Sequence, residues 1–533
     1  MSNASYLINQ LDQSINSFEQ RVDGRVNSVY SATNNVHATA NKIYDGIQRF
    51  KEDMMKGEQT QIAHENIMRI DQVIKEQFSN HEAIRKTVMG VVRDFDINLV
   101  RNSTIQELSE ELWITSSRYW LSYAMIAITA WVNNYPEVAR NALAESGRRD
   151  DIKTTLFFCL MNLRFERMDA AKKWFCEYLK VLDPNMLQQE TAVLLQAFLN
   201  GIFGKDKELE GEVTSLIDQW IGELNADAQA CEELVEAYKN YIENLNPNVS
   251  FPYSTLGEFC TNCDAMKQSY RDVSKFDQMV AVLKTLDVEM ESQDESNYKA
   301  RVDAVLINLI SNYDPEELSL RNQQSYYRYI VDNQGDIGAA ELQFEEEQRL
   351  QNERFNIGKQ FIRWAVYDDN DETDVHVRKF GMRNTRQWFR AALDRWDIEL
   401  QDRHPLNYHL AIDTWQGTSN GEDQAEQVTA MRNYFENNKF QNMYINTPNI
   451  AAVIVLILSI GLAFVTAYSL IATVLAAGFL VFRVLKAMKD YPRRVEAALE
   501  NLNKCMEEIA EFKQYFADNR QKKDDILRLL ESI

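Results

Sequence analysis

The sequence predicts an almost wholly α-helical protein. Glycine and proline, which most often mark strands and tight turns, number only 18 and 8 in 533 residues. Long stretches rich in Glu, Gln, Ala, Leu, Lys and Arg carry apolar residues three and four positions apart, the spacing of one helix face. We therefore expect several all-α folding units and few strands: long N-terminal coiled-coil helices, a helical-repeat-like middle, an apolar transmembrane hairpin and a C-terminal amphipathic helix.

The first predicted region, residues 1–100, carries a coiled-coil pattern. An apolar residue recurs every seven positions, the spacing that buries one seam of a helix against a partner helix. The alternating seam position is poor, because Arg25 and Gly46 occupy it, so a helix over residues 4–55 needs further partners. The heptad residues that we assign to oligomerisation are Ile8, Ile15, Val22, Val29, Val36, Ile43 and Phe50.

A second amphipathic helix is expected after a break at Lys56 and Gly57. Its apolar residues run from Ile67 to Phe95 at helical spacing. The two helices can fold back on each other or join an oligomer, and heptads alone do not separate these arrangements. We favour self-association through this region.

Residues 101–245 are predicted to form a solenoid-like helical domain. A capping box at Thr104 and Glu107 predicts the start of its first helix, which contains the apolar run Tyr119–Val132. That run is too short to cross a bilayer, so it indicates a core helix, with an interfacial or re-entrant segment as the alternative.

Short helices in pairs are expected over residues 134–184. Ala139 with Leu143 is echoed by Ala171 with Phe175 at a spacing of 32. The pattern resembles the tetratricopeptide repeat over these residues, although the Trp and Gly signature of that repeat is missing. The resemblance implies stacked helix pairs.

A second helical domain is predicted over residues 254–440, after a linker at 246–253 that contains two prolines. Helices are expected to continue to about Trp415, and Gly417–Asp423 is expected to be a surface loop. Breaks between the helices are expected near residues 293–296, 314–315, 333–336 and 368–374.

The strongest functional signal is the run Ile450–Phe482, which holds 33 consecutive positions without a charged side chain. About 20 apolar residues cross a bilayer as one helix, so the run favours a two-helix hairpin over one upright span. One long tilted helix is the alternative. The hairpin is expected within residues 448–488, and its membrane-inserting residues are Ile450, Val453, Leu456, Ile460, Phe464, Leu470, Val474, Phe479 and Phe482.

Charge suggests how the hairpin is oriented. The net charge of -23 disfavours nucleic acid as a partner, whereas basic residues outnumber acidic ones just after the apolar run, as on a cytoplasmic flank beside anionic lipid. No secretory signal is found at the N-terminus, so we expect a membrane protein whose large N-terminal part and C-terminal tail are cytoplasmic. The residues predicted to contact lipid headgroups are Arg483, Lys486, Lys489, Arg493 and Arg494.

The last predicted element, residues 492–533, is an amphipathic helix beginning at Pro492. One apolar stripe runs from Val495 through Leu502 and Ile509 to Phe516, which is typical of a coiled-coil arm.

Motifs that carry chemistry are weak. Cys260 and Cys263 form a lone C-x-x-C pair without further zinc ligands, and the acidic residues at 368–374 lack the spacing of a calcium loop. Basic residues over 378–390 interleave with Trp388 and can contact headgroups or RNA, but the aromatic spacing favours a buried helix face. No catalytic, cofactor-binding or metal motif is found, so we predict neither an enzyme nor a cofactor.

Two functions fit these features. The first is a membrane-anchored helical scaffold or tethering protein, which self-associates and recruits protein partners at the cytoplasmic face. The second resembles α-helical pore-forming or membrane-remodelling proteins, in which an apolar hairpin inserts into the bilayer on assembly. An enzyme with a membrane anchor is a third class, which only a convergent polar pocket would favour.

Overall fold

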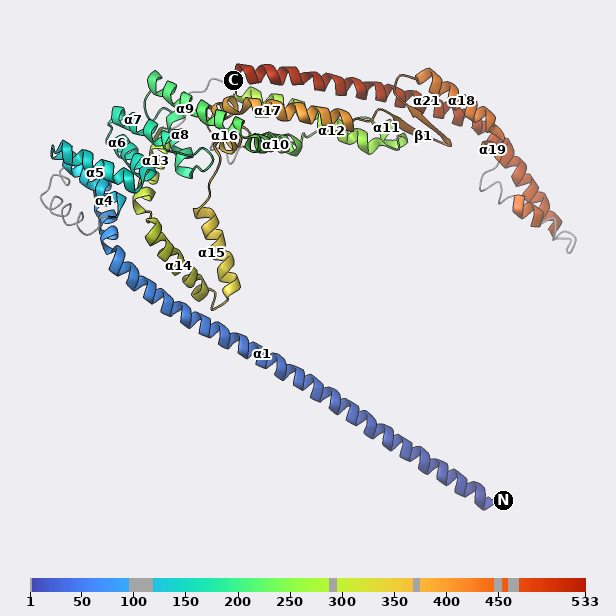
Figure 1. Ribbon diagram of the computed structural model, residues 1–533. Coiled ribbons are helices and arrows are strands. Elements are labelled where there is room, and N and C mark those ends of the chain that lie inside the picture. Colours follow the sequence, from blue (N-terminus) through green and yellow to red (C-terminus); the bar gives the residue numbers. More distant parts are fainter. Residues whose placement is uncertain (1, 95–117, 287–294, 368–373, 445–452, 459–468) are drawn as a thin grey trace. The chain divides into compact units, whose positions relative to one another are not determined.

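The computed structural model describes residues 2–94, 118–286, 295–367, 374–444, 453–458 and 469–533 (Figure 1). The described chain is all-α except for one β-hairpin, which confirms the predicted class. Contacts divide the chain into two units, and each unit joins two stretches of sequence. Unit 1 holds residues 1–181 with 303–354, and unit 2 holds residues 182–302 with 355–533.

Unit 1 begins with α1 (Ser2–Asp94), a continuous helix of 93 residues (Figure 1). At 1.5 Å per residue it is about 140 Å long. The predicted break at Lys56 and Gly57 is therefore wrong. A glycine inside a helix costs only about 1 kcal/mol, and the contacts that the helix makes from Lys56 onward offset that cost.

Short paired helices follow in unit 1, as the repeat-like pattern predicts. They are α4 (Trp120–Val132), α5 (Pro136–Arg149), α6 (Asp151–Arg164) and α7 (Met168–Lys180), in which α4 packs on α5 and α6 on α7. Ten of the 13 residues of α4 are buried, which confirms a core helix. The predicted capping box at Thr104 and Glu107 lies outside the described residues.

A helical hairpin completes unit 1. The end of α13 (Glu295–Ser311) leads to α14 (Pro315–Asp332) and α15 (Ile337–Gln351), and α14 packs along α1. The breaks predicted near 314–315 and 333–336 are confirmed, whereas those near 293–296 and 368–374 fall mostly outside the described residues.

In the first part of unit 2, several helices pack against α17 (Val375–Arg403). Trp388 and Trp396 of α17 are almost fully buried, while Arg383, Arg386 and Arg390 are exposed, so the predicted core stripe is confirmed. The helices of this part are α8 (Gln189–Leu199), α9 (Lys207–Ala226), α10 (Ala228–Asn244), α11 (Ser254–Phe259), α12 (Cys263–Leu286), α16 (Ile357–Val366) and α17 (Val375–Arg403).

A β-hairpin stands where helix and loop were predicted. β1 (Tyr408–Ile412) pairs antiparallel with β2 (Trp415–Ser419), and Asp413 adopts φ 56° in the turn. The prediction of a helix to Trp415 is therefore wrong, and the loop predicted over Gly417–Asp423 begins only after Ser419. Alternate residues of β1 are buried, a period of two that five residues are too few to reveal in sequence.

The chain ends with α18 (Gln424–Asn437), α19 (Lys439–Tyr444) and α21 (Ser469–Ser532). Helix α21 runs unbroken through Pro492, so the predicted start at Pro492 is wrong (Figure 1). The neighbouring Tyr491 is buried and donates a hydrogen bond to the Phe435 carbonyl at 2.7 Å, which holds the helix at this point. The predicted apolar stripe of α21, including Leu502, is buried against α11, α12 and α18.

Within the described residues, no helix is both long and apolar enough to cross a membrane. The predicted transmembrane hairpin therefore has no support in the fold. Residues 448–452 and 459–468 of the predicted hairpin lie outside the described part.

Candidate functional site

The first candidate surface is the exposed α1 segment, Asp23–Met55. Every side chain in this segment is exposed. The four predicted oligomerisation residues that it contains are 63% (Val29), 68% (Val36), 59% (Ile43) and 65% (Phe50) exposed. The side chains of Ile8, Ile15 and Val22 are outside the described part.

Further apolar residues widen the apolar stripe that these heptad residues form on α1. Ile47 and Met54 follow the heptad positions by four residues, so they lie beside Ile43 and Phe50 on the same helix face. A helix that exposes such a face over several turns can bury it only against another helix or an apolar surface.

The exposed α1 segment ends where the α14–α15 turn meets α1. Lys56 Nζ donates to Asp336 at 2.9 Å, and the backbone of Lys56 lies against Gly335. Beyond this point α1 buries Ile70, Ile74 and Phe78 in unit 1. The same helix is therefore a surface on one side of Lys56 and a core element on the other.

The second candidate surface is the apolar start of α21, residues 469–488. Phe479, Val481, Phe482 and Leu485 are exposed, and their spacing places them on more than one side of the helix. Of the other predicted membrane-inserting residues, Val453 and Val474 are exposed, Leu456 is half-buried, the side chain of Leu470 is not described, and Ile450, Ile460 and Phe464 lie outside the described residues.

The predicted headgroup residues follow this segment directly on α21. Lys486, Lys489 and Arg493 are exposed, and Arg483 is half-buried. Arg494 instead donates both guanidinium hydrogen bonds to Asp413, at the turn of the β-hairpin. This pair joins α21 to the turn between β1 and β2, while the Arg494 side chain remains 44% exposed.

A third feature is a charged cluster between α1 and α14 in unit 1. Glu317 is fully buried and accepts two hydrogen bonds from Arg85, at 2.8 and 2.9 Å, and others from Arg321, at 3.2 and 3.4 Å. Both guanidinium groups also lie 4.9 Å from the centre of the Tyr313 ring. Two cations thus share one carboxylate and one aromatic ring.

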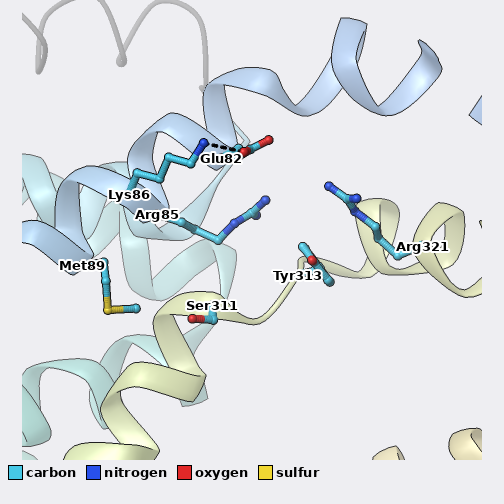
Figure 2. Close-up of a pocket in the computed structure, with 7 residues that line it drawn as sticks. All are labelled: Glu82, Arg85, Lys86, Met89, Ser311, Tyr313 and Arg321. Atoms are coloured by element: carbon cyan, nitrogen blue, oxygen red, sulfur yellow. Dashed lines mark ion pairs between the residues drawn. The ribbon is translucent and has the colours of Figure 1, made fainter. Parts of the chain in front are cut away.

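This cluster borders a hollow of about 460 Å³ (Figure 2). Figure 2 shows the guanidinium groups of Arg85 and Arg321 pointing toward each other, with Tyr313 between them. Lys86 pairs with Glu82 at its edge, 2.6 Å apart. The remaining lining residues are Met89 and Ser311.

Buried titratable groups surround the Glu317 cluster. His81 stacks on Tyr119 at 4.2 Å, and burial lowers the pKa of His81, which favours the neutral ring. Burial raises the pKa of Asp314 to about 6, against the opposing charge of Lys153. The hydroxyl of Tyr119 is buried without a hydrogen-bond partner among the described residues.

Other groups with potential chemistry serve packing. Cys260 and Cys263 are buried free thiols in the core of unit 2, and burial raises the pKa of each, which disfavours the reactive thiolate. Ser269 bonds to His404 at 2.8 Å, but the half-buried ring of His404 stacks on Phe512 and Phe516. No group of metal-ligating side chains occurs in the part of the chain that the structure describes.

Sequence reasoning missed the Glu317 cluster. Arg85 and Glu317 are separated by 232 positions, and no motif connects them. The available signal was local: Arg85 follows Ile84 within an apolar helix face, where a charged residue needs a buried partner.

Comparisons with known proteins add no assignment. The chain matches no protein-family model, no curated protein and no solved structure.

Proposed function

We propose that this protein is a membrane-anchored helical scaffold, which self-associates through the exposed α1 segment and recruits protein partners at the cytoplasmic face. The observation that carries the proposal is the apolar stripe of α1, whose heptad residues Val29, Val36, Ile43 and Phe50 are each more than half exposed. Apolar residues at this spacing gain stability when a second helix covers them. A second copy of the same helix offers the same stripe.

Anchoring is the second part of the proposal. The apolar start of α21 exposes aromatic and aliphatic side chains on more than one side and is followed at once by exposed lysines. Such a segment resembles the end of a membrane-embedded helix at the headgroup layer. Because α21 continues without a break into the core of unit 2, insertion of its start would fix unit 2 to the bilayer.

Self-association is tested with paired substitutions. Val36→Glu with Ile43→Glu places two charges on the stripe, whereas Asn34→Glu with Asn41→Glu places the same charges on another face of the same helix. In light scattering we expect the first variant to form particles of fewer chains than the unmodified protein. The second variant should form particles of the same size as the unmodified protein. Removal of Met1–Lys56 should likewise abolish self-association while leaving membrane attachment intact. The same number of chains per particle in all four proteins would refute the proposal.

Anchoring is tested by fractionation and carbonate extraction of the membranes. The intact protein is expected to stay in the membrane pellet, and a variant lacking Ile450–Phe482 is expected to be released. Phe479→Glu with Phe482→Glu should weaken attachment with fewer changes to α21. An intact protein that is extracted as completely as the deletion variant would refute constitutive anchoring.

The alternative function is an α-helical pore-forming or membrane-remodelling protein. The continuity of α21 favours it in one respect, because a single helix joins the apolar segment to a folded unit and can transmit insertion to that unit. This function requires a form that stays in solution until it meets liposomes. Release of a dye from the liposomes on mixing would support it over the scaffold.

A further inference from the structure

We infer that the hollow between α1 and α14 binds a phosphate-type oxyanion. Its lining brings together Arg85, Lys86 and Arg321 with the hydroxyl groups of Ser311 and Tyr313 (Figure 2). This site is independent of the proposed scaffold function, because it lies on the packed part of α1, beyond Lys56.

Charge is the first argument. Arg85 and Arg321 share a single carboxylate, that of Glu317, so the Glu317 cluster keeps one positive charge in excess. The other lining carboxylate, Glu82, is matched by Lys86. An anion placed in the hollow would therefore meet one more cation than carboxylates among the lining residues and Glu317, an excess that the nearby carboxylates of Asp71 and Asp314 reduce in part.

Preorganisation is the second argument. Glu317 is fully buried, and its two oxygens hold Arg85 in a fixed bidentate arrangement. The Tyr313 ring contacts both guanidinium groups and restricts them further. Two planar donors held in place lose little side-chain entropy when a ligand binds, which favours arginine at phosphate sites.

Unused donors are the third argument. The hydrogen bonds of Arg321 to Glu317 involve Nε and Nη2, and Nη1 donates to no described residue. Neither do the hydroxyl groups of Ser311 and Tyr313 form a hydrogen bond within the described chain. These groups form a set composed mainly of donors, which suits the acceptor oxygens of phosphate, and Lys86, paired with Glu82, lies at the edge of the set.

The experiment titrates inorganic phosphate into the full chain by calorimetry, with sodium chloride at the same ionic strength as the reference. A parallel arm measures binding to vesicles with and without phosphatidic acid, which separates free phosphate from a lipid headgroup as the source of the oxyanion. Binding in either arm supports the proposal only if it depends on the lining residues.

Three variants test that dependence. Lys86→Gln and Tyr313→Phe each remove one donor and leave the pairing of Glu317 with the arginines intact, so we expect each to weaken binding by roughly threefold to tenfold. Lys75→Gln is the matched control, because Lys75 forms the same kind of exposed pair on α1, with Asp71, outside the hollow. Phosphate binding that is absent in both arms, or that all three variants weaken equally, would overturn the inference.

Discussion

Gly335 lies directly against the backbone of Lys56. A Cβ atom at Gly335 would be 1.9 Å from the Lys56 carbonyl oxygen, and Gly335 itself adopts φ +84°, which L side chains rarely do. The next residue, Asp336, accepts a hydrogen bond from Lys56 Nζ at 2.9 Å and another from the Ala339 amide at 3.2 Å, at the start of α15. The α14–α15 turn thus contacts α1 at the point where the exposed α1 segment ends.

Gly335→Ala is expected to destabilise this contact by about 2 kcal/mol or more, because it combines backbone strain with a clash against backbone. The measurement is hydrogen exchange of the α14 and α15 amides in the full chain. Gly338→Ala is the control, since its added Cβ meets only Asp336 Oδ1, at 3.7 Å. Faster exchange in the first variant alone is the expected result, and equal exchange in both would contradict the assignment.

The stability of unit 1 should depend on pH because of Asp314. Burial raises its pKa to about 6 in the folded state, against about 3.9 in an unfolded chain. Its stabilising contribution is therefore fully present below about pH 3.9 and is lost as the pH rises through 6, a change of about 2–3 kcal/mol. The protection factors of the α14 amides, which compare their exchange with that of an unfolded chain at the same pH, should fall over this range.

Two variants separate Asp314 from other titrating groups. Asp314→Asn should remove this part of the pH dependence. Lys153→Gln should move it to higher pH, because Lys153 lies 3.5 Å from Asp314 and lowers its pKa. A pH profile that neither substitution changes would show that another group is responsible.

How much the sequence could predict depended on the length of each pattern. The stripe of α17 and the apolar run of α4 extend over several turns, and both proved to be buried as predicted. The breaks at Gly57 and Pro492 did not occur, because tertiary contacts of α1 and α21 outweigh the local preference of one residue. The β-hairpin was missed since each strand has five residues.

The candidate surfaces were predictable only where they are local in sequence. The heptad residues of α1 were found because their spacing is visible along one helix, and the exposed segment now shows which of them are unpacked. The Glu317 cluster could not be found, since it joins residues of α1 to residues of α14 that follow more than two hundred positions later. The division into two units, each made of two separate stretches of the chain, likewise leaves no signal in the sequence.

The stability of unit 2 should also depend on pH, because of His404, but with the opposite sign. Burial, with a smaller effect of Lys513, lowers its pKa to about 4, against about 6.5 in an unfolded chain. Its contribution is present above about pH 6.5 and is lost as the pH falls toward 4, because protonation is easier in the unfolded chain. The protection factors of α21 amides near Phe512 and Phe516, taken against an unfolded chain at the same pH, should therefore fall on acidification. His404→Asn should flatten this response, and an unchanged response would exclude His404 as its source.

Asp397 holds the C-terminal part of α21 to α17. It is 3% exposed and accepts hydrogen bonds from Arg520, at 2.7 and 3.2 Å, and from Lys523, at 3.0 Å. Burial alone would raise the pKa of Asp397, but these two cations lower it below its usual value. The carboxylate is therefore charged at neutral pH, and its removal would leave two cations without their buried partner.

Asp397→Asn is expected to destabilise unit 2 by about 2–3 kcal/mol, less than a fully buried pair would lose, because Arg520 is 38% exposed. Asp394→Asn is the matched control on the same helix. Asp394 also pairs with Lys523, at 2.8 Å, but is 51% exposed, so its loss should cost less than about 1 kcal/mol. Unfolding in denaturant, monitored by hydrogen exchange of the last α21 amides, distinguishes the two variants. Similar losses for both would mean that the contact between α21 and α17 depends on apolar packing rather than on this buried carboxylate.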